Sequence, residues 1–166
     1  MKLAQHVLLI AATVTTGLMA GLFAAFAYAV MPALRGADDK TFVDVMQRIN
    51  VTILNGWFLS SFLGALALLA LSALLAWRGV GRPALPWIIC GLALYLVTLL
   101  ITSAANVPLN DQLAAAGDPS GITDLATVRE RFESAWVTWN IVRALANTAA
   151  LGCLAWALIV QGRTAG

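Results

Sequence analysis

The stretch "ESAWVTWNIVRALANTAALGCLAWALIV", residues 133–160, decides the fold class of this chain. From residue 137 onward it is apolar and long enough for a membrane-spanning helix, which takes about 20 residues. Three polar side chains, Asn140, Arg143 and Asn147, interrupt the apolar run, and Glu133 opens it. Because a charged side chain at the bilayer centre costs about 2.5–3.5 kcal/mol on insertion scales, one face of this helix must avoid lipid.

The composition of the whole chain is that of a membrane protein. Of its 166 residues, 61% are hydrophobic and 11% are charged, whereas soluble proteins contain about 45–50% apolar and about 25% charged residues. We therefore expect an integral membrane protein with one domain, residues 1–166, and membrane lipid as its surroundings. The net charge is +2 and the basic residues are scattered, so no nucleic acid partner is expected.

Four apolar segments are long enough to cross a bilayer: residues 7–31, 57–77, 85–105 and 137–160. They must be helical, because lipid offers no partner for free backbone groups. The first run, of about 23 residues, exceeds the 7–15 of a signal peptide, so we expect it to be retained. Pro32 and Pro108 are expected to end the first and third helices. The predicted fold is all-α, an up-down-up-down bundle of four transmembrane helices.

The connections between these segments differ in length and charge. The second is a tight turn, "RGVGRPALP". The first contains an amphipathic pattern after Asp38 or Asp39, which predicts a short interfacial helix. All eight acidic residues lie in the two long connections, and the end with the termini carries only basic residues. That distribution favours cytoplasmic termini and, for a bacterial chain, the inner membrane.

Polar residues of the third and fourth segments form two stripes. At about 100° per residue, each stripe falls within an arc of about 80°. The stripes are Glu133, Trp136, Asn140, Arg143 and Asn147, and Tyr95, Thr98, Thr102 and Asn106. Further polar residues are expected at the same end of the bundle, opposite the termini: Tyr28, Asn50, Asn55, Asn110 and Asp111. The sequence thus predicts a polar pocket with an apolar floor at that end.

Arg143 allows three interpretations. Its long side chain can snorkel to the membrane surface. It can be structural, paired with Glu133, Asp111 or helix-end carbonyls. It can also belong to a functional site, as ionisable residues within membranes often do. A closed cavity beside an Arg143 without a carboxylate partner would favour the third interpretation.

Motifs for metals and common cofactors are missing from the sequence. His6 is the single histidine, and Cys90 and Cys153 lie inside apolar runs without metal-ligand spacing. We therefore predict no metal and no cofactor, and interpret the two cysteines as packing residues.

Four blocks of the chain resemble the anthrone oxygenase family: "FAYAVMPALR", "MQRINVTILNGWF", "NVPLNDQLA" and "FESAWVTWNIVRALANTAA". The resemblance implies a small membrane protein of four helices. In characterised fungal members the activity is oxidation of a polyketide anthrone to an anthraquinone by dioxygen, without metal or flavin. By that resemblance, the substrate of this chain would be a small hydrophobic aromatic molecule.

The implied chemistry needs a base and a site for an oxyanion. Glu133 or Asp111 would be the base, and Arg143 would hold the oxyanion. The substrate-binding candidates are Tyr28, Asn55, Asn106, Asn110, Trp136 and Asn140.

Two other functions compete with the oxygenase. One is a non-catalytic membrane protein that binds a lipid or small hydrophobic ligand, or an accessory subunit. The other, a transporter, is disfavoured because the polar stripes fade toward the termini and the chain is short for an inverted repeat. A stripe of small residues, Thr13, Gly17, Gly21 and Ala25, leaves open whether the first helix packs within the chain or against a second copy in a homo-oligomer.

Overall fold

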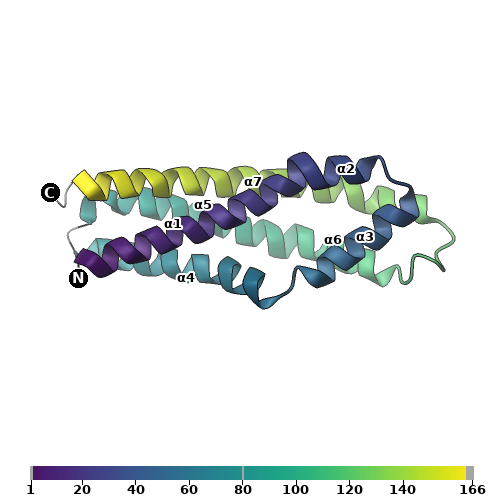
Figure 1. Ribbon diagram of the computed structural model, residues 1–166, viewed down its shortest axis with the longest axis horizontal. Coiled ribbons are helices and arrows are strands. Elements are labelled where there is room, and N and C mark those ends of the chain that lie inside the picture. Colours follow the sequence, from purple (N-terminus) through teal and green to yellow (C-terminus); the bar gives the residue numbers. More distant parts are fainter. Residues whose placement is uncertain (1, 80, 164–166) are drawn as a thin grey trace.

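The computed structural model describes residues 2–79 and 81–163, and its regular elements are helices (Figure 1). Four helical stretches are long and apolar enough to cross a membrane: Leu3–Arg35, Gly56–Arg78, Arg82–Ala115 and Leu125–Arg163. They run side by side with alternating direction, so the predicted four-helix bundle is confirmed. Both ends of the chain lie at one end of the bundle (Figure 1). We call the opposite end the distal end.

The four stretches contain the following elements. The first comprises α1 (Lys2–Ala25), the π-helical segment η1 (Phe26–Val30) and α2 (Met31–Arg35), and the second is α4 (Gly56–Arg78). The third comprises η2 (Arg82–Ala84), α5 (Leu85–Ile101), the π-helical segment η3 (Thr102–Asn106) and α6 (Val107–Ala115). The fourth is α7 (Leu125–Arg163), and α3 (Asp39–Thr52) lies in the first long connection.

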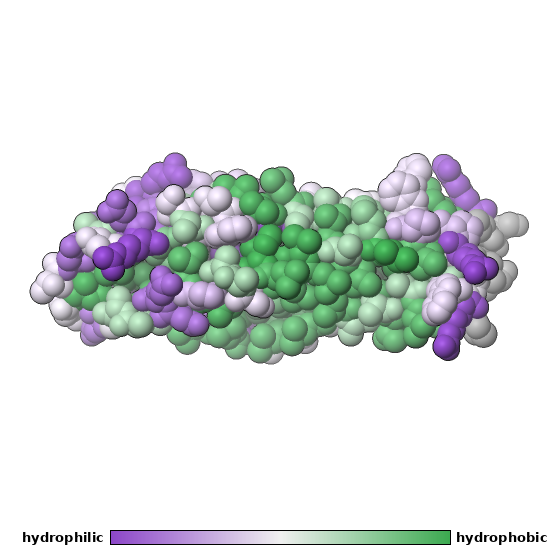
Figure 2. All heavy atoms as spheres, turned by 180° about the vertical axis from the view of Figure 1, so that it is seen from behind, coloured by the Kyte–Doolittle hydropathy of each residue, from purple (hydrophilic) through white to green (hydrophobic). Residues whose placement is uncertain are grey.

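On the face shown in Figure 2, an apolar belt covers the middle of the bundle between more hydrophilic ends. Large apolar side chains such as Leu63 and Leu145 are 56% and 66% exposed on this belt. A soluble protein rarely exposes so much contiguous apolar surface. The belt is therefore the part of the molecule that faces lipid.

The expected ends of the first and third spans are wrong, because neither Pro32 nor Pro108 ends its helix. A π-helical turn precedes each proline, and the N–H groups of Met31 and Val107 bond the carbonyls of Phe26 and Thr102. In a regular helix a proline ring clashes with the carbonyl four residues earlier. The wider turn moves that part of the backbone, so both helices continue toward the distal end.

The distal end is closed by α3. The Asp38 carboxylate accepts a hydrogen bond from the Thr41 amide, which caps the helix as predicted. Gln47 then ties α3 to α6, since its side-chain amide donates to the carbonyls of Leu113 (2.8 Å) and Gly117 (3.0 Å). As a result α3 lies over the interior of the bundle.

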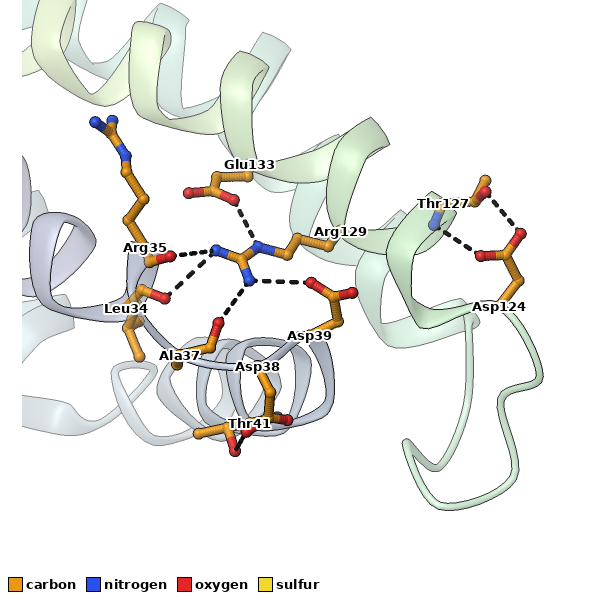
Figure 3. A network of polar contacts seen from close by, with 10 residues as sticks. All are labelled: Leu34, Arg35, Ala37, Asp38, Asp39, Thr41, Asp124, Thr127, Arg129 and Glu133. Atoms are coloured by element: carbon orange, nitrogen blue, oxygen red, sulfur yellow. Dashed lines mark hydrogen bonds and ion pairs between the residues drawn. The ribbon is translucent and has the colours of Figure 1, made fainter.

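A second set of polar contacts, made by Arg129, holds α2 and α3 to α7 (Figure 3). The Arg129 guanidinium donates to the carbonyls of Arg35 (3.1 Å) and Ala37 (2.8 Å). It also forms ion pairs with Asp39 (3.0 Å) and Glu133 (2.7 Å). The carbonyls belong to the end of α2 and the residues just after it, where helix carbonyls lack partners within the helix. The contacts of Gln47 and of Arg129 together hold α3 in place over the distal end of the bundle.

Candidate functional site

The distal half of the bundle contains a cavity of about 460 Å³. Its walls come from α1, η1, α3, α4, η3, α6 and α7. The lining residues are Phe23, Phe26, Gln47, Ile49, Asn50, Val51, Ile53, Leu54, Phe58, Thr102, Asn106, Val107, Asn110, Asp111, Ala114, Trp136 and Arg143. Most of them are apolar or aromatic, with a few polar groups, as is usual for small-molecule sites.

Of the two α7 residues that line the cavity, Arg143 lies nearer to the end with the termini, and its side chain points into the bundle. Its side chain belongs to a residue that is only 6% exposed, so it does not snorkel. The guanidinium donates to the Asn140 Oδ1 atom (3.0 Å) and to the Thr102 hydroxyl (3.2 Å). It also stacks over Phe23, with 4.0 Å between the guanidinium carbon and the ring centroid.

No carboxylate in the described residues 2–79 and 81–163 forms an ion pair with Arg143. The Nε atom of Arg143 is buried and has no hydrogen-bond partner. A buried charge without a counter-charge is costly. The cavity beside it is therefore electrostatically suited to an anionic group.

Asn140 positions Arg143 rather than facing the cavity. Its side-chain amide donates to the Phe23 carbonyl (3.1 Å), and its oxygen accepts from Arg143. Both polar groups of this fully buried side chain are thus engaged within the protein. The predicted binding residue Asn140 is not among the residues that line the cavity.

Asn106 and Asn110 line the cavity on the side of η3 and α6. Asn106 is 1% exposed, and its Oδ1 atom is buried without a partner. The Asn110 oxygen accepts a hydrogen bond from the Trp136 indole (2.8 Å), which leaves its amide hydrogens free to donate to a ligand.

The polar stripes of the third and fourth spans meet in part: Thr102 bonds Arg143, and Asn106 bonds the Trp136 carbonyl. Tyr95 instead donates to the Phe62 carbonyl of α4.

Aromatic rings form the walls around these polar groups. Trp136 packs against Phe26 with 5.6 Å between ring centroids, and Phe58 stacks on Phe62 at 5.3 Å. The Phe23 ring lies under Arg143. Such walls suit a flat aromatic ligand, because ring stacking adds to the gain from burial.

Asp111 is an exposed residue at the edge of the cavity. Its carboxylate has no ion pair within the part of the chain that the structure describes, and it is not within ion-pair distance of Arg143. One cavity thus carries a carboxylate and a guanidinium that do not neutralise each other directly.

Three other predicted site residues lie outside the cavity. Glu133 forms the ion pair with Arg129 and borders a separate surface hollow (Figure 3). Tyr28 is 73% exposed. Asn55 is exposed and caps α4, because its side-chain oxygen accepts from the amides of Trp57 (3.0 Å) and Phe58 (3.1 Å). The structure gives each of these residues surroundings other than the proposed binding site.

Two polar cavity residues, Gln47 and Asn50, come from α3. Asn50 was expected at this end of the bundle but not as a binding residue, and Gln47 was not predicted there. The Asn50 amide nitrogen is buried without a partner. The sequence shows that both belong to an amphipathic helix, but not that this helix folds back over the third and fourth spans. Among the described residues, no group of three or more histidine, cysteine, aspartate or glutamate side chains could hold a metal ion.

The family model for anthrone oxygenase matches residues 57–153. The chain belongs to the anthrone oxygenase family. Comparison with curated proteins and with solved structures gave no match. In this anthrone oxygenase family member, the matched segment includes Asn110, Asp111 and Arg143, whereas Phe23 and Asn50, from α1 and α3, lie before it.

Proposed function

We propose that the cavity binds a flat aromatic ketone or phenol of the anthrone type and oxidises it with dioxygen. The observation that carries this proposal is Arg143, a buried cation with no carboxylate partner among the described residues, on the wall of an aromatic cavity. Membership of the anthrone oxygenase family supports the reaction class. The specific substrate and its turnover belong to the proposal.

The cavity volume agrees with such a ligand. At about 460 Å³ it lies within the range of about 300–1,000 Å³ that is common for small-molecule sites. A ring system between Phe58 and Trp136 would place an oxygen substituent toward Arg143. The buried amides of Asn50 and Asn106 would contact polar substituents at the edge of the rings.

The first step in the proposed reaction is removal of a C–H proton from the methylene group of the substrate. Asp111 accepts this proton, and the carbon's electron pair moves onto the ketone oxygen to give an enolate. The Arg143 guanidinium and the Asn110 amide stabilise the negative oxygen. Such donors, fixed in a water-poor site, are more effective than water because they are already oriented.

Dioxygen then oxidises the enolate carbon. A C–O bond forms, the electron pair of the enolate reduces dioxygen to the peroxide level, and protonation gives a hydroperoxide. Loss of the second C–H proton and cleavage of the O–O bond yield a new ketone and water. The balance is one CH₂ group plus O₂ giving one C=O group plus H₂O, so no external reductant is needed.

The placement of the two candidate bases favours Asp111 over Glu133. Asp111 lines the cavity, whereas the Glu133 carboxylate is held by Arg129 at 2.7 Å. A general base must come within hydrogen-bond reach of the proton it removes. We accordingly assign Glu133 to the polar contacts of Arg129 that hold α2 and α3 to α7.

Oxygen uptake by the protein in nanodiscs, with anthrone as the substrate, tests the proposal. Anthraquinone formation is followed by absorbance, and the uncatalysed reaction is subtracted with empty nanodiscs. We expect Asp111→Asn to lose at least about a hundredfold in rate, the lower range for loss of a general base. The surface variant Glu130→Gln, which removes an exposed carboxylate from the same end of the molecule, should retain the rate.

The same experiment separates catalysis from binding. Saturable binding of anthrone without oxygen uptake above the empty-nanodisc rate would refute the oxidation and leave the non-catalytic binding function. Full turnover by both Asp111→Asn and Arg143→Met would refute the assigned site.

A further inference from the structure

The cavity lies where the bundle leaves the hydrocarbon layer. α7 has 39 residues and is thus about 58 Å long, almost twice the roughly 30 Å of hydrocarbon that a spanning helix must cross. Counting about 20 residues back from Arg163, at the end with the termini, reaches Ala144. Arg143 therefore stands at the distal boundary of the hydrocarbon.

Two exposed tryptophans support this position of the distal hydrocarbon boundary. Trp57, at the start of α4, is 87% exposed, and Trp139 on α7 is 42% exposed. Exposed tryptophans gather where the hydrocarbon meets the headgroups. The corner between α3 and α4, residues 51–57, therefore lies at that boundary and not in open water.

Large apolar side chains stand at the exposed edge of the cavity on the side of α3 and the start of α6. Val51, Leu54 and Val107 line the cavity and are 75%, 64% and 43% exposed. They come from the end of α3 with the following turn and from the start of α6, whereas the other exposed lining residues, Asp111 and Ala114, lie further along α6. In water such a rim would expose apolar surface at an energetic cost. In the bilayer the same side chains contact acyl chains at no such cost.

The polarity of the cavity runs from this apolar edge to polar groups in the interior. Arg143 and Asn106 are 6% and 1% exposed, deeper than the three rim residues. A ligand from the bilayer would enter with its polar edge first and remain in apolar contact throughout. Asp111 is exposed, which gives the carboxylate a separate route for its proton to water.

We propose that the cavity exchanges its ligand laterally with the bilayer leaflet at the distal end, through the mouth formed by Val51, Leu54 and Val107. This deepens the proposed function, because it rests on the cavity being the ligand site and specifies a ligand dissolved in the membrane. Water-soluble aromatic anions that stay out of the bilayer would be poor ligands.

Nitroxide accessibility tests the position of the mouth without any need for turnover. Single cysteines replace Leu54 or Val107 in a Cys90→Ala/Cys153→Ala background and carry a spin label in liposomes. Collisions with dioxygen, which concentrates in lipid, are compared with collisions with a water-soluble nickel chelate. The reference positions are Leu63, 56% exposed on the apolar belt, and Ser120, in the exposed loop.

We expect labels at positions 54 and 107 to resemble the label at 63. If they resemble the label at 120 instead, the mouth opens to water and the proposal is wrong. This outcome is independent of anthrone oxidation. A lipid-facing mouth in a protein without turnover would refute only the oxidation.

The route itself is tested by transfer kinetics with 1-hydroxyanthraquinone as the probe, delivered from donor vesicles. Val107→Trp should fill the mouth and slow association by about tenfold, equal to about 1.4 kcal/mol of added barrier. The control is Val97→Trp, which places the same bulk at a 41% exposed position of α5 that does not line the cavity. Equal association rates for both variants would overturn the lateral route.

Discussion

Replacing Arg143 by methionine should leave the fold nearly as stable as before while weakening ligand binding about a hundredfold. Methionine is similar in length to the apolar part of arginine and suits an irregular apolar site. The variant Arg143→Met removes the hydrogen bonds to Asn140 (3.0 Å) and Thr102 (3.2 Å). It also removes the stacking on Phe23.

The opposing contributions to stability are of similar size. Two hydrogen bonds from a charged donor contribute about 3–6 kcal/mol together, and stacking on an aromatic ring about 1–2 kcal/mol. Against this, the buried guanidinium, without a carboxylate partner in the described part of the chain, carries a desolvation penalty of several kcal/mol. The melting temperature should therefore change by only a few degrees, at about 2–4 °C per kcal/mol for a chain of this size.

Ligand affinity should respond much more strongly. Loss of a charge-assisted contact to an oxyanion, about 3 kcal/mol, lowers affinity by about a hundredfold. Thermal unfolding in nanodiscs and titration with 1-hydroxyanthraquinone measure the two effects on the same preparation.

Arg129→Met is the matched control on the same helix. Arg129 has two carboxylate partners and is 13% exposed in its side chain, so its loss should cost about 2–4 kcal/mol of stability. The affinity of the folded protein should remain. If Arg143→Met instead loses more stability than Arg129→Met and keeps its affinity, Arg143 is a structural lock and the reasoning is refuted.

Three further predictions concern the fold around the site. The Cys90 and Cys153 sulfurs are 3.5 Å apart, so a membrane-permeant oxidant should form a disulfide that joins α5 to α7 within one chain. The oxidised protein should then no longer react with maleimide, whereas Cys153 of the Cys90→Ser variant should still react after the same treatment. Gln47→Met removes two hydrogen bonds, from α3 to α6 and to Gly117 just after it, and should cost about 1–3 kcal/mol. Amide exchange in α3 should become faster, and unchanged exchange would show that these bonds do not hold α3 in place. The bonds from the Thr127 amide and hydroxyl lower the pKa of Asp124 below its ordinary value of 3.8, so the carboxylate should stabilise the first turn of α7 above that value. The protection of these amides from exchange, relative to the intrinsic rate at each pH, should fall as the pH falls through the lowered pKa, and Asp124→Asn should abolish this pH dependence.

The bundle and the facing polar stripes could be predicted from the sequence because lipid leaves few alternatives. Arg143 and Asn140 cannot face acyl chains at acceptable cost, so helical periodicity alone turns them inward. Asn106 follows by the same reasoning on the third span. The structure agrees: these three residues are 6%, 0% and 1% exposed.

The positions of residues nearest the distal end are harder to predict from the sequence, because a polar side chain there can face water on any side of its helix. Glu133 lies on the polar arc of its helix, yet Arg129, one turn earlier, holds it in an ion pair. Asn55 satisfies helix amides at the start of α4. Asn50 enters the cavity because α3 folds back across the bundle, and that tertiary contact leaves no periodic signal in the sequence.

The π-helical segment η3 both accommodates Pro108 within the third span and turns polar side chains of that span into the cavity. In a regular helix Asn110 would lie about 80° around the axis from Thr102, eight residues earlier. The wide turn, in which the Val107 amide bonds the Thr102 carbonyl, absorbs one residue and brings Asn110 to within about 20° of Thr102 on the other side. Thr102 can then bond Arg143 while Asn110 bonds Trp136. The turn that lets the third span continue past its proline thus also directs both side chains into the same cavity.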